Sequence, residues 1–426
     1  MRVELRYGKT GLAVSLPDQN VAQVLRMGRL PVIEDVAERV RGGLREPLGA
    51  APLSRLAEGR RSACVVVSDI TRPVPNGALL PPLLDALQEA GLDAGDVLVL
   101  VATGLHRANT DDELRDMGLG EALDRGVCVQ NHLARDQAGH TYLGETSMGI
   151  PAWVDTRYVR AELRILTGLV EPHLMAGYSG GRKAICPGLC DAETIMAWHS
   201  PGMLEPEHAR QGVLAGNLVH EQALEVARLA GGAHTTLNVT IDEARRVTGV
   251  FVGDMVAAHE AAAAQARRQT RVTIAEPVDI VITSAAGYPL DLTFYQGIKG
   301  IVAAAPIVKP GGTIIIAQEN SEGIGSDEFA DIMLHTRDAR EHVQRALAGN
   351  TSTIDQWQLH VLEKVLRKCE VLNYCTGLPA DTQRELFVTP VDSVEAGLEA
   401  ALGRHGTDAK IAVIPDGPYV LCEVAG

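Results

Sequence analysis

Histidines, a lysine and clustered glycines gather in one short stretch of the chain. It runs from Glu171 to Lys183 as Glu-Pro-His-Leu-Met-Ala-Gly-Tyr-Ser-Gly-Gly-Arg-Lys, and His199 follows soon after. Histidines transfer protons or bind metals, a lysine amine can form a covalent bond, and glycines let backbone amides approach an anion. This combination predicts a site for a phosphorylated or metal-containing cofactor.

The glycine-rich loop does not match the common nucleotide-binding motifs. A Walker loop ends in Gly-Lys-Ser/Thr, but here Arg182 separates Gly181 from Lys183, and Ala184 follows where a hydroxyl would hold Mg²⁺. No Gly-x-Gly-x-x-Gly pattern follows a predicted strand, which argues against a dinucleotide site. For the loop taken alone, a tight surface turn with a solvated lysine is the alternative.

Two series of strands must position these residues. Short β-branched runs alternate with helical stretches, which predicts largely parallel sheets. The first series comprises residues 63–68, 97–102, 163–169 and 235–240, and the second comprises 279–283, 313–317, 371–374 and 410–414. An alanine-rich helix at 257–271 separates them. We therefore predict two α/β domains, residues 1–272 and 273–426, each with a parallel sheet flanked by helices.

Polar residues follow several of these strands. The strand ends lead to Asp69, Thr71 and Arg72, to His106, and to Glu171 and His173, while a helix in the second domain places Tyr295, Gln296 and Lys299 together. Ligands of open parallel sheets bind beyond the carboxyl ends of the strands. One site in the cleft between the domains is the simplest arrangement.

The histidines and cations each have a structural and a functional interpretation. His106 and His173 could cap strand ends, but together they favour an acid/base pair of the kind that racemisation needs. His199 follows a helix that Asp191 could cap; without a metal we expect it to be a surface cap, because a helix C-terminus favours protonated imidazole. Arg72 and Lys299 could be solvated, although carboxylate binding suits them better.

Composition limits the class of protein. At 426 residues with 46% hydrophobic residues, the chain is long enough for two or more globular domains. No apolar run reaches membrane-spanning length and no signal peptide is visible, so we expect a cytoplasmic protein. The net charge of −15 argues against nucleic-acid binding. Seven cysteines without a CxxC pair predict reduced thiols, and Cys186 and Cys190 lack the spacing of a zinc knuckle.

Several motifs together resemble the nickel-dependent lactate racemase family. They are Ser-Asp69-x-Thr-Arg72-Pro, Ala-Thr-Gly-x-His106-Arg, Glu-x-His173-x-x-Ala-Gly-x-Ser-Gly-Gly-Arg-Lys183, His199-Ser, Tyr295-Gln-x-x-Lys299-Gly and the closing Ile414-Pro-Asp-Gly417. The likeness extends in order over nearly the whole chain. It implies a racemase or epimerase of 2-hydroxy acids that carries a nickel-pincer nucleotide, a pyridinium-3-thioamide-5-thiocarboxylic acid mononucleotide holding Ni(II).

The resemblance also implies roles for individual residues. Lys183 would join the cofactor covalently, His199 would ligate nickel, and His106 and His173 would act alternately as base and acid at the substrate hydroxyl. Other implied contacts to the cofactor come from Asp69 and Thr71, and we add the backbone amides of Ser179, Gly180 and Gly181 as candidate phosphate donors. Implied contacts to the substrate come from Arg72, Tyr295, Gln296, Lys299 and Trp357.

Departures from the family pattern concern the pocket wall. Leu105, Leu174 and Met175 stand where the lactate enzymes carry bulky aromatic residues, so lactate, malate and sugar acids all stay open as substrates. The resemblance implies cofactor-synthesis enzymes as partners and leaves a homo-oligomer open. Two rival readings remain: a non-catalytic carrier of the nucleotide, and an enzyme using Lys183 as a Schiff-base lysine with pyridoxal phosphate.

Overall fold

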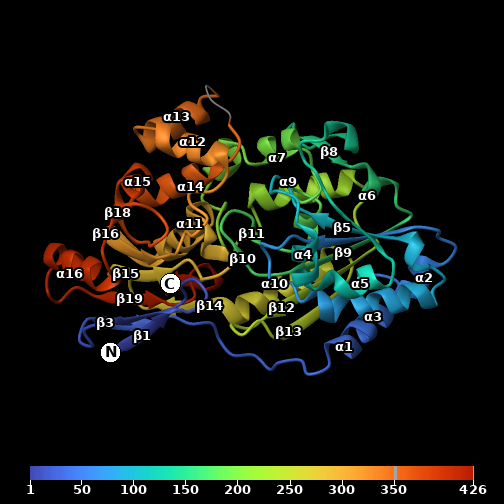
Figure 1. The fold of residues 1–426 in the computed structure, drawn as a ribbon, viewed down its shortest axis with the longest axis horizontal. Coiled ribbons are helices and arrows are strands. Elements are labelled where there is room, and N and C mark those ends of the chain that lie inside the picture. The colour runs from blue at the N-terminus through green and yellow to red at the C-terminus, as the bar shows by residue number, and fades with distance from the viewer. Residues whose placement is uncertain (350–352, 426) are drawn as a thin grey trace.

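Two six-stranded sheets form the framework of the described residues, which are 1–349 and 353–425 of this computed structural model. They lie side by side in Figure 1, each with helices packed on it. This confirms the predicted class of α/β fold with two sheets.

The first sheet contains five parallel strands and one antiparallel edge strand. In spatial order it contains β13 (Val247–Gly253), β12 (Thr235–Ile241), β9 (Leu163–Leu169), β4 (Ala63–Ser68), β5 (Val97–Ala102) and β6 (Cys128–Asn131). All four strands predicted for this half are present. Their nearly continuous burial is typical of parallel strands that are covered on both faces.

The second sheet is parallel throughout. Its spatial order is β18 (Thr389–Pro390), β17 (Glu370–Tyr374), β16 (Val308–Ala317), β15 (Val278–Ser284), β19 (Ile411–Ile414) and β3 (Val21–Val24). The four strands predicted for this half are again present, with β16 starting five residues before the predicted 313–317.

The N-terminal segment belongs to the second sheet. β3 pairs in parallel with β19, and the hairpin of β1 (Arg2–Leu5) and β2 (Leu12–Ser15) buries Val3, Leu5 and Val14 against that sheet. In Figure 1 the blue N-terminal strands accordingly lie beside β19, away from α1. This differs from the predicted division, which counted these residues with the first domain. The physical reason is that the hairpin covers apolar residues of a sheet formed by the other end of the chain.

Helices cover both faces of each sheet. In the first half they are α1 (Val36–Arg45), α2 (Leu53–Ala57), α3 (Asn76–Glu89), α4 (Asp111–Leu114), α5 (Gly120–Asp124), α6 (Thr156–Arg160), α7 (Ala192–Trp198), α8 (Pro201–Leu204), α9 (Leu218–Leu229) and α10 (Ala257–Thr270). In the second half they are α11 (Phe294–Ala304), α12 (Asp327–His335), α13 (Ala339–Leu347), α14 (Gln356–Leu366), α15 (Ala380–Glu385) and α16 (Val394–His405). Thr110 caps α4 in a capping box with Glu113.

One apolar core joins the two halves. It contains Trp198 of α7, Val219 of α9, Phe294 of α11 and Trp357 of α14, all buried. Three two-stranded sheets complete the fold, β7 (His140–Glu145) with β8 (Pro151–Asp155), β10 (Pro172–His173) with β11 (Gly177–Tyr178), and β14 (Arg271–Ile274) with β20 (Leu421–Val424). Among the described residues, no helix is both long and apolar enough to cross a membrane.

Candidate active site

His106 lies against a buried carboxylate. β4 and β5 are neighbours with Ser68 opposite Ala102, so the loops that follow them are adjacent. Nδ1 of His106 lies 2.6 Å from Oδ2 of Asp69, whose other oxygen accepts from the Thr71 hydroxyl at 2.6 Å. Burial alone would raise the pKa of Asp69, but the charge and hydrogen bond of His106 outweigh it and the pKa is lowered. Asp69 therefore contacts His106, and Thr71 holds Asp69, while the cofactor contacts that the family resemblance implies for both residues stay a prediction.

His173 is held by the backbone that follows it. It lies on β10, and its Nδ1 accepts from the amides of Met175 and Ala176, each at 3.2 Å. Burial, with the charges of Lys183 and Arg72, holds the pKa of His173 well below its usual range. The ring is therefore neutral at pH 7, with Nδ1 as an acceptor and the proton on Nε2.

The glycine-rich loop is packed and internally hydrogen-bonded. The Ser179 amide donates to Glu171 O at 2.9 Å, and the Gly181 amide donates to Asn238 Oδ1 at 3.1 Å. A Cβ on Gly180 would lie 2.6 Å from Val170 Cγ2, and one on Gly181 would lie 2.9 Å from the His259 ring. Two of the predicted phosphate donors are thus already engaged, because the glycines permit close packing of the loop.

Lys183 follows this loop in a single helical turn, Gly181–Ala184. Its Nζ lies 4.7 Å from the centre of the Trp198 ring. Burial, then the charges of Arg182 and Arg72, hold the pKa of Lys183 well below its ordinary value. A neutral amine is the form that reacts covalently with an acyl or carbonyl group.

His199 ends α7, which Asp191 caps as predicted. Its ring stacks on Trp357 with centres 4.2 Å apart and meets Trp198 edge-on at 4.4 Å. Burial lowers the pKa of His199 to about 3, and Nδ1 lies 3.0 Å from Ile195 O. The expectation of a surface cap in the metal-free case is wrong, because His199 is buried between two tryptophans.

Cations from the two halves meet beside His173. Arg72 follows β4, and Lys299 lies on α11 with its amine bonded to Gln296 Oε1. The two cations, Glu171 and Tyr419 line the same small pocket. Burial and Arg72 lower the pKa of Lys299 to about 7, although Glu171 and Asp69 act in the opposite direction.

Tyr295 and Trp357 form a contact across two helices. Trp357 Nε1 donates to the Tyr295 hydroxyl at 2.9 Å. Since Trp357 also stacks on His199, this bond links α11 to the histidine. Two of the predicted pocket residues of the second half are therefore in contact, and Trp357 belongs to the buried core.

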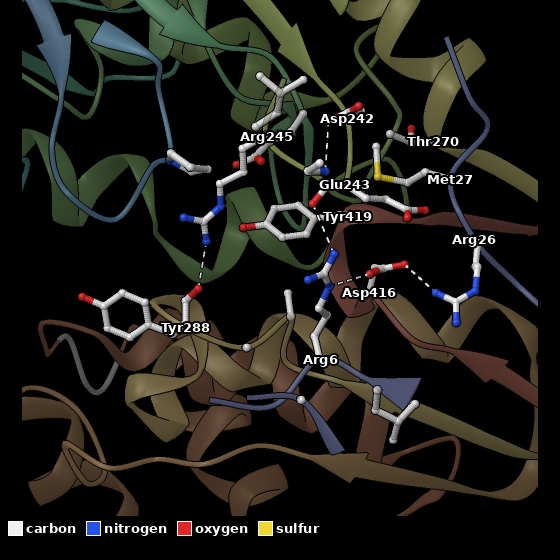
Figure 2. Close-up of a pocket in the computed structure, with 18 of the residues that line it drawn as sticks. Arg6, Arg26, Met27, Asp242, Glu243, Arg245, Thr270, Tyr288, Asp416 and Tyr419 are labelled. Atoms are coloured by element: carbon white, nitrogen blue, oxygen red, sulfur yellow. Dashed lines mark hydrogen bonds and ion pairs between the residues drawn. The ribbon is translucent and has the colours of Figure 1, made fainter. Parts of the chain in front are cut away.

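A larger cleft of about 730 Å³ adjoins the small pocket. Figure 2 shows Arg6, Arg26, Asp416 and Tyr419 around it, together with Arg245, whose guanidinium donates to Tyr288 O at 2.9 Å. Glu171 and Tyr419 line both cavities. Neither Glu171 nor Tyr419 was predicted as a site residue. Tyr419 follows the closing Asp-Gly motif by two residues, and this position could have indicated it.

The chain is therefore a two-domain α/β protein with a histidine, lysine and arginine site lined from both halves. The family model described as lactate racemase N-terminal domain matches residues 7–212, and the lactate racemase C-terminal domain matches residues 273–422. The chain belongs to the lactate racemase family, and this membership makes it an isomerase.

Named relatives cover almost the full length. The lactate racemase of Thermoanaerobacterium thermosaccharolyticum is 34% identical over 98% of both chains. That of Lactiplantibacillus plantarum is 32% identical over 98% of this chain and 99% of that protein. The solved apoprotein of the T. thermosaccharolyticum lactate racemase superimposes with a TM-score of 0.92, at 33% identity over 99% of this chain and 100% of the other. A Thermotoga maritima crystal structure, with TM-score 0.68 and 18% identity over 91% of this chain and 98% of the other, shares the fold.

Proposed function

We propose that this protein interconverts the stereoisomers of a short-chain 2-hydroxy acid, lactate-like or malate-like, with a nickel-pincer nucleotide joined to Lys183. The observation that carries the proposal is that Lys183 and His199 both contact the Trp198 ring, with Nζ of Lys183 4.7 Å and the His199 ring 4.4 Å from its centre. The full-length relatives named as lactate racemases support the same reaction. We further propose a cytoplasmic location, with cofactor-synthesis enzymes as the partners that load the protein.

The donor set fits such a cofactor. His199 is neutral, and a hydrogen bond from Nδ1 to Ile195 O leaves Nε2 free as a ligand. Within residues 1–349 and 353–425, no group of three or more His, Cys, Asp or Glu side chains could hold a metal ion. His199 would then be the protein ligand of nickel, and soft donors on the nucleotide would complete the coordination. Bound in this way, the cofactor would supply hydride transfer at the substrate carbon.

The protein residues bind the acid and move its hydroxyl proton. Arg72 and Lys299 would hold the carboxylate, since guanidinium suits bidentate contact, and Tyr295, Gln296 and Trp357 would form the wall. His106 and His173 would serve the two enantiomers, one accepting the substrate hydroxyl proton as a base and the other supplying its own proton to the product hydroxyl as an acid. Asp69 would hold His106 in the required orientation and tautomer, through its contact with Nδ1.

The decisive experiment is co-expression with the cofactor-synthesis enzymes, followed by intact-protein mass, nickel analysis and a chiral assay on a panel of 2-hydroxy acids. We expect an adduct on the Lys183 peptide, about one nickel per chain as a single site requires, and loss of stereochemical purity in at least one acid. Folded protein without adduct or nickel would refute the cofactor. Loaded protein that changes no acid would favour the carrier instead.

The Schiff-base alternative has a separate test. Pyridoxal phosphate bound to Lys183 would absorb at the edge of the visible range, and borohydride would abolish that absorbance. A protein that shows neither property has no such aldehyde linkage.

A further inference from the structure

Glu171 lies inside the cluster that we propose for the substrate carboxylate. Its Oε1 is 3.5 Å from Nε of Arg72, and both side chains are largely buried, at 16% and 19% exposed. Arg72 and Lys299 both lower the pKa of Glu171 against the effect of burial, so both cations lie close to its carboxyl group. A carboxylate of the protein's own thus pairs with Arg72 in the pocket that Lys299 also lines.

The pocket around these residues is nearly filled. Arg72, Glu171, His173 and Lys299 line a cavity of about 20 Å³, which has room for little more than one water molecule. A 2-hydroxy acid cannot enter this space beside Glu171. Room for a ligand carboxylate therefore requires the Glu171 side chain to move.

The side chain of Glu171 is free to do so while its backbone is not. The Glu171 amide donates to Ser179 Oγ at 3.0 Å, and its carbonyl accepts from the Ser179 amide at 2.9 Å. In contrast, no hydrogen bond to its carboxylate occurs among residues 1–349 and 353–425. Charge alone therefore holds the carboxylate in place, and the large cleft, which Glu171 also lines, offers space into which it can turn.

We propose that Glu171 is an internal counter-ion that occupies the carboxylate subsite of the empty protein and is displaced by the substrate carboxylate. The inference rests on the proposed function, in which Arg72 and Lys299 receive that carboxylate. Two cations buried together without an anion repel each other, and Glu171 neutralises this charge between turnovers. The consequence is a competition, because an incoming carboxylate must replace a carboxylate that is already present.

The competition predicts the sign of a mutational effect. Glu171→Gln removes the charge at nearly constant size, so the full-length, cofactor-free protein should bind lactate about tenfold more tightly, equivalent to about 1.4 kcal/mol. Calorimetric titration with lactate, about two pH units below the pKa of Lys299 so that both cations stay charged in the variant as well, measures this directly. Glu171→Asp keeps the charge and should bind lactate as weakly as the unchanged protein.

Glu243→Gln is the matched control. Glu243 is an acidic residue of the adjoining large cleft that does not line the small pocket. Its substitution should leave lactate affinity unchanged, while Arg72→Met should abolish the gain produced by Glu171→Gln. Thermal unfolding of each variant confirms that it is folded.

The outcomes separate this inference from the proposed function. Equal, weaker or undetectable lactate binding by Glu171→Gln would refute the proposal that Glu171 is a displaceable counter-ion. Glu171 would then be a residue that positions the Arg72 side chain. If Glu243→Gln also binds lactate more tightly, the gain comes from the lower negative charge of the whole cleft and not from the position of Glu171. Racemisation by the loaded enzyme is measured separately. If the loaded enzyme racemises no acid but Glu171→Gln binds lactate more tightly, the proposed reaction is refuted and the carboxylate subsite is retained.

Discussion

The carboxylate of Asp69 lies 2.6 Å from Nδ1 of His106. This pair joins the loops after two neighbouring strands, β4 and β5, and the Thr71 hydroxyl holds the other carboxylate oxygen at 2.6 Å. Because one ring nitrogen is occupied by Asp69, the other nitrogen is the one available to a substrate hydroxyl. In the proposed reaction, Nε2 is therefore the nitrogen of His106 that would act as base or acid.

Asp69→Asn should lower kcat about 100-fold in both directions in the loaded enzyme, within the range of a lost acid–base group. The asparagine side chain is neutral and carries an NH2 group in place of one carboxylate oxygen. It therefore stabilises the proton on Nδ1 of His106 less well and holds the ring less firmly in one orientation. Nickel content per chain is the second measurement. Nickel retained with low kcat supports the His106 role, whereas nickel lost would return Asp69 to the cofactor contact implied by the family resemblance.

Tyr295→Phe should destabilise the cofactor-free protein by about 1–3 kcal/mol. It leaves Trp357 Nε1, which is buried in the stack on His199, without its acceptor at 2.9 Å. Urea unfolding of the variant gives the value. Tyr142→Phe, at an exposed tyrosine of β7, should change the free energy of unfolding by only about a few tenths of a kcal/mol.

A double-mutant cycle tests the pair directly. Trp357→Phe removes the donor, so Tyr295→Phe should cost less in that background. Strict additivity of the two changes would show that the hydrogen bond does not contribute to stability.

The sheets were predictable from local pattern, but the sheet that the N-terminal strands join was not. Runs such as 63–68 and 279–283 are short, β-branched and apolar, and these properties belong to the segment itself. The place of β3 depends on β19, at the other end of the chain, and on an apolar face that the hairpin happens to cover. No local signal in residues 1–25 records that partner.

The site was predictable as a set of residues but not as a set of contacts. His173 and Arg72, predicted from strand ends, and Lys299, predicted from a helix, line one pocket. The partnership of Asp69 with His106 and the burial of His199 depend on rotamers and on packing against Trp198 and Trp357. Glu171 was part of the motif, but the pocket that it shares with Arg72 and Lys299 exists only after the halves pack together.

The glycine loop illustrates the same limit and provides a prediction. Gly180 has φ +73, and a Cβ there would lie 2.6 Å from Val170 Cγ2. Gly180→Ala should therefore cost about 2–4 kcal/mol, from left-handed strain together with overpacking. Gly59→Ala is the control, because Gly59 has φ +72 with no atom within 4 Å of an added Cβ. Gly59→Ala should cost about 1 kcal/mol. Denaturant unfolding measures both variants, and equal losses of stability at the two sites would show that close packing at Gly180 does not matter.

Binding of a carboxylate ligand should depend on the ionisation of Lys299. Burial and the charge of Arg72 lower its pKa to about 7, so the amine is charged below that pH and neutral above it. A carboxylate binds the charged form, which means that binding takes up a proton. Lactate affinity should be constant below about pH 6 and fall about tenfold per pH unit above the pKa.

Calorimetry in two buffers of different ionisation enthalpy measures both the pH dependence and the proton uptake. Lys299→Arg keeps a positive charge throughout this range, since guanidinium does not deprotonate in proteins, and should abolish the decline above pH 7. Glu171 raises the pKa of Lys299, so Glu171→Gln should shift the decline to lower pH. A decline that persists unchanged in Lys299→Arg would assign the titration to another group and refute the role of Lys299.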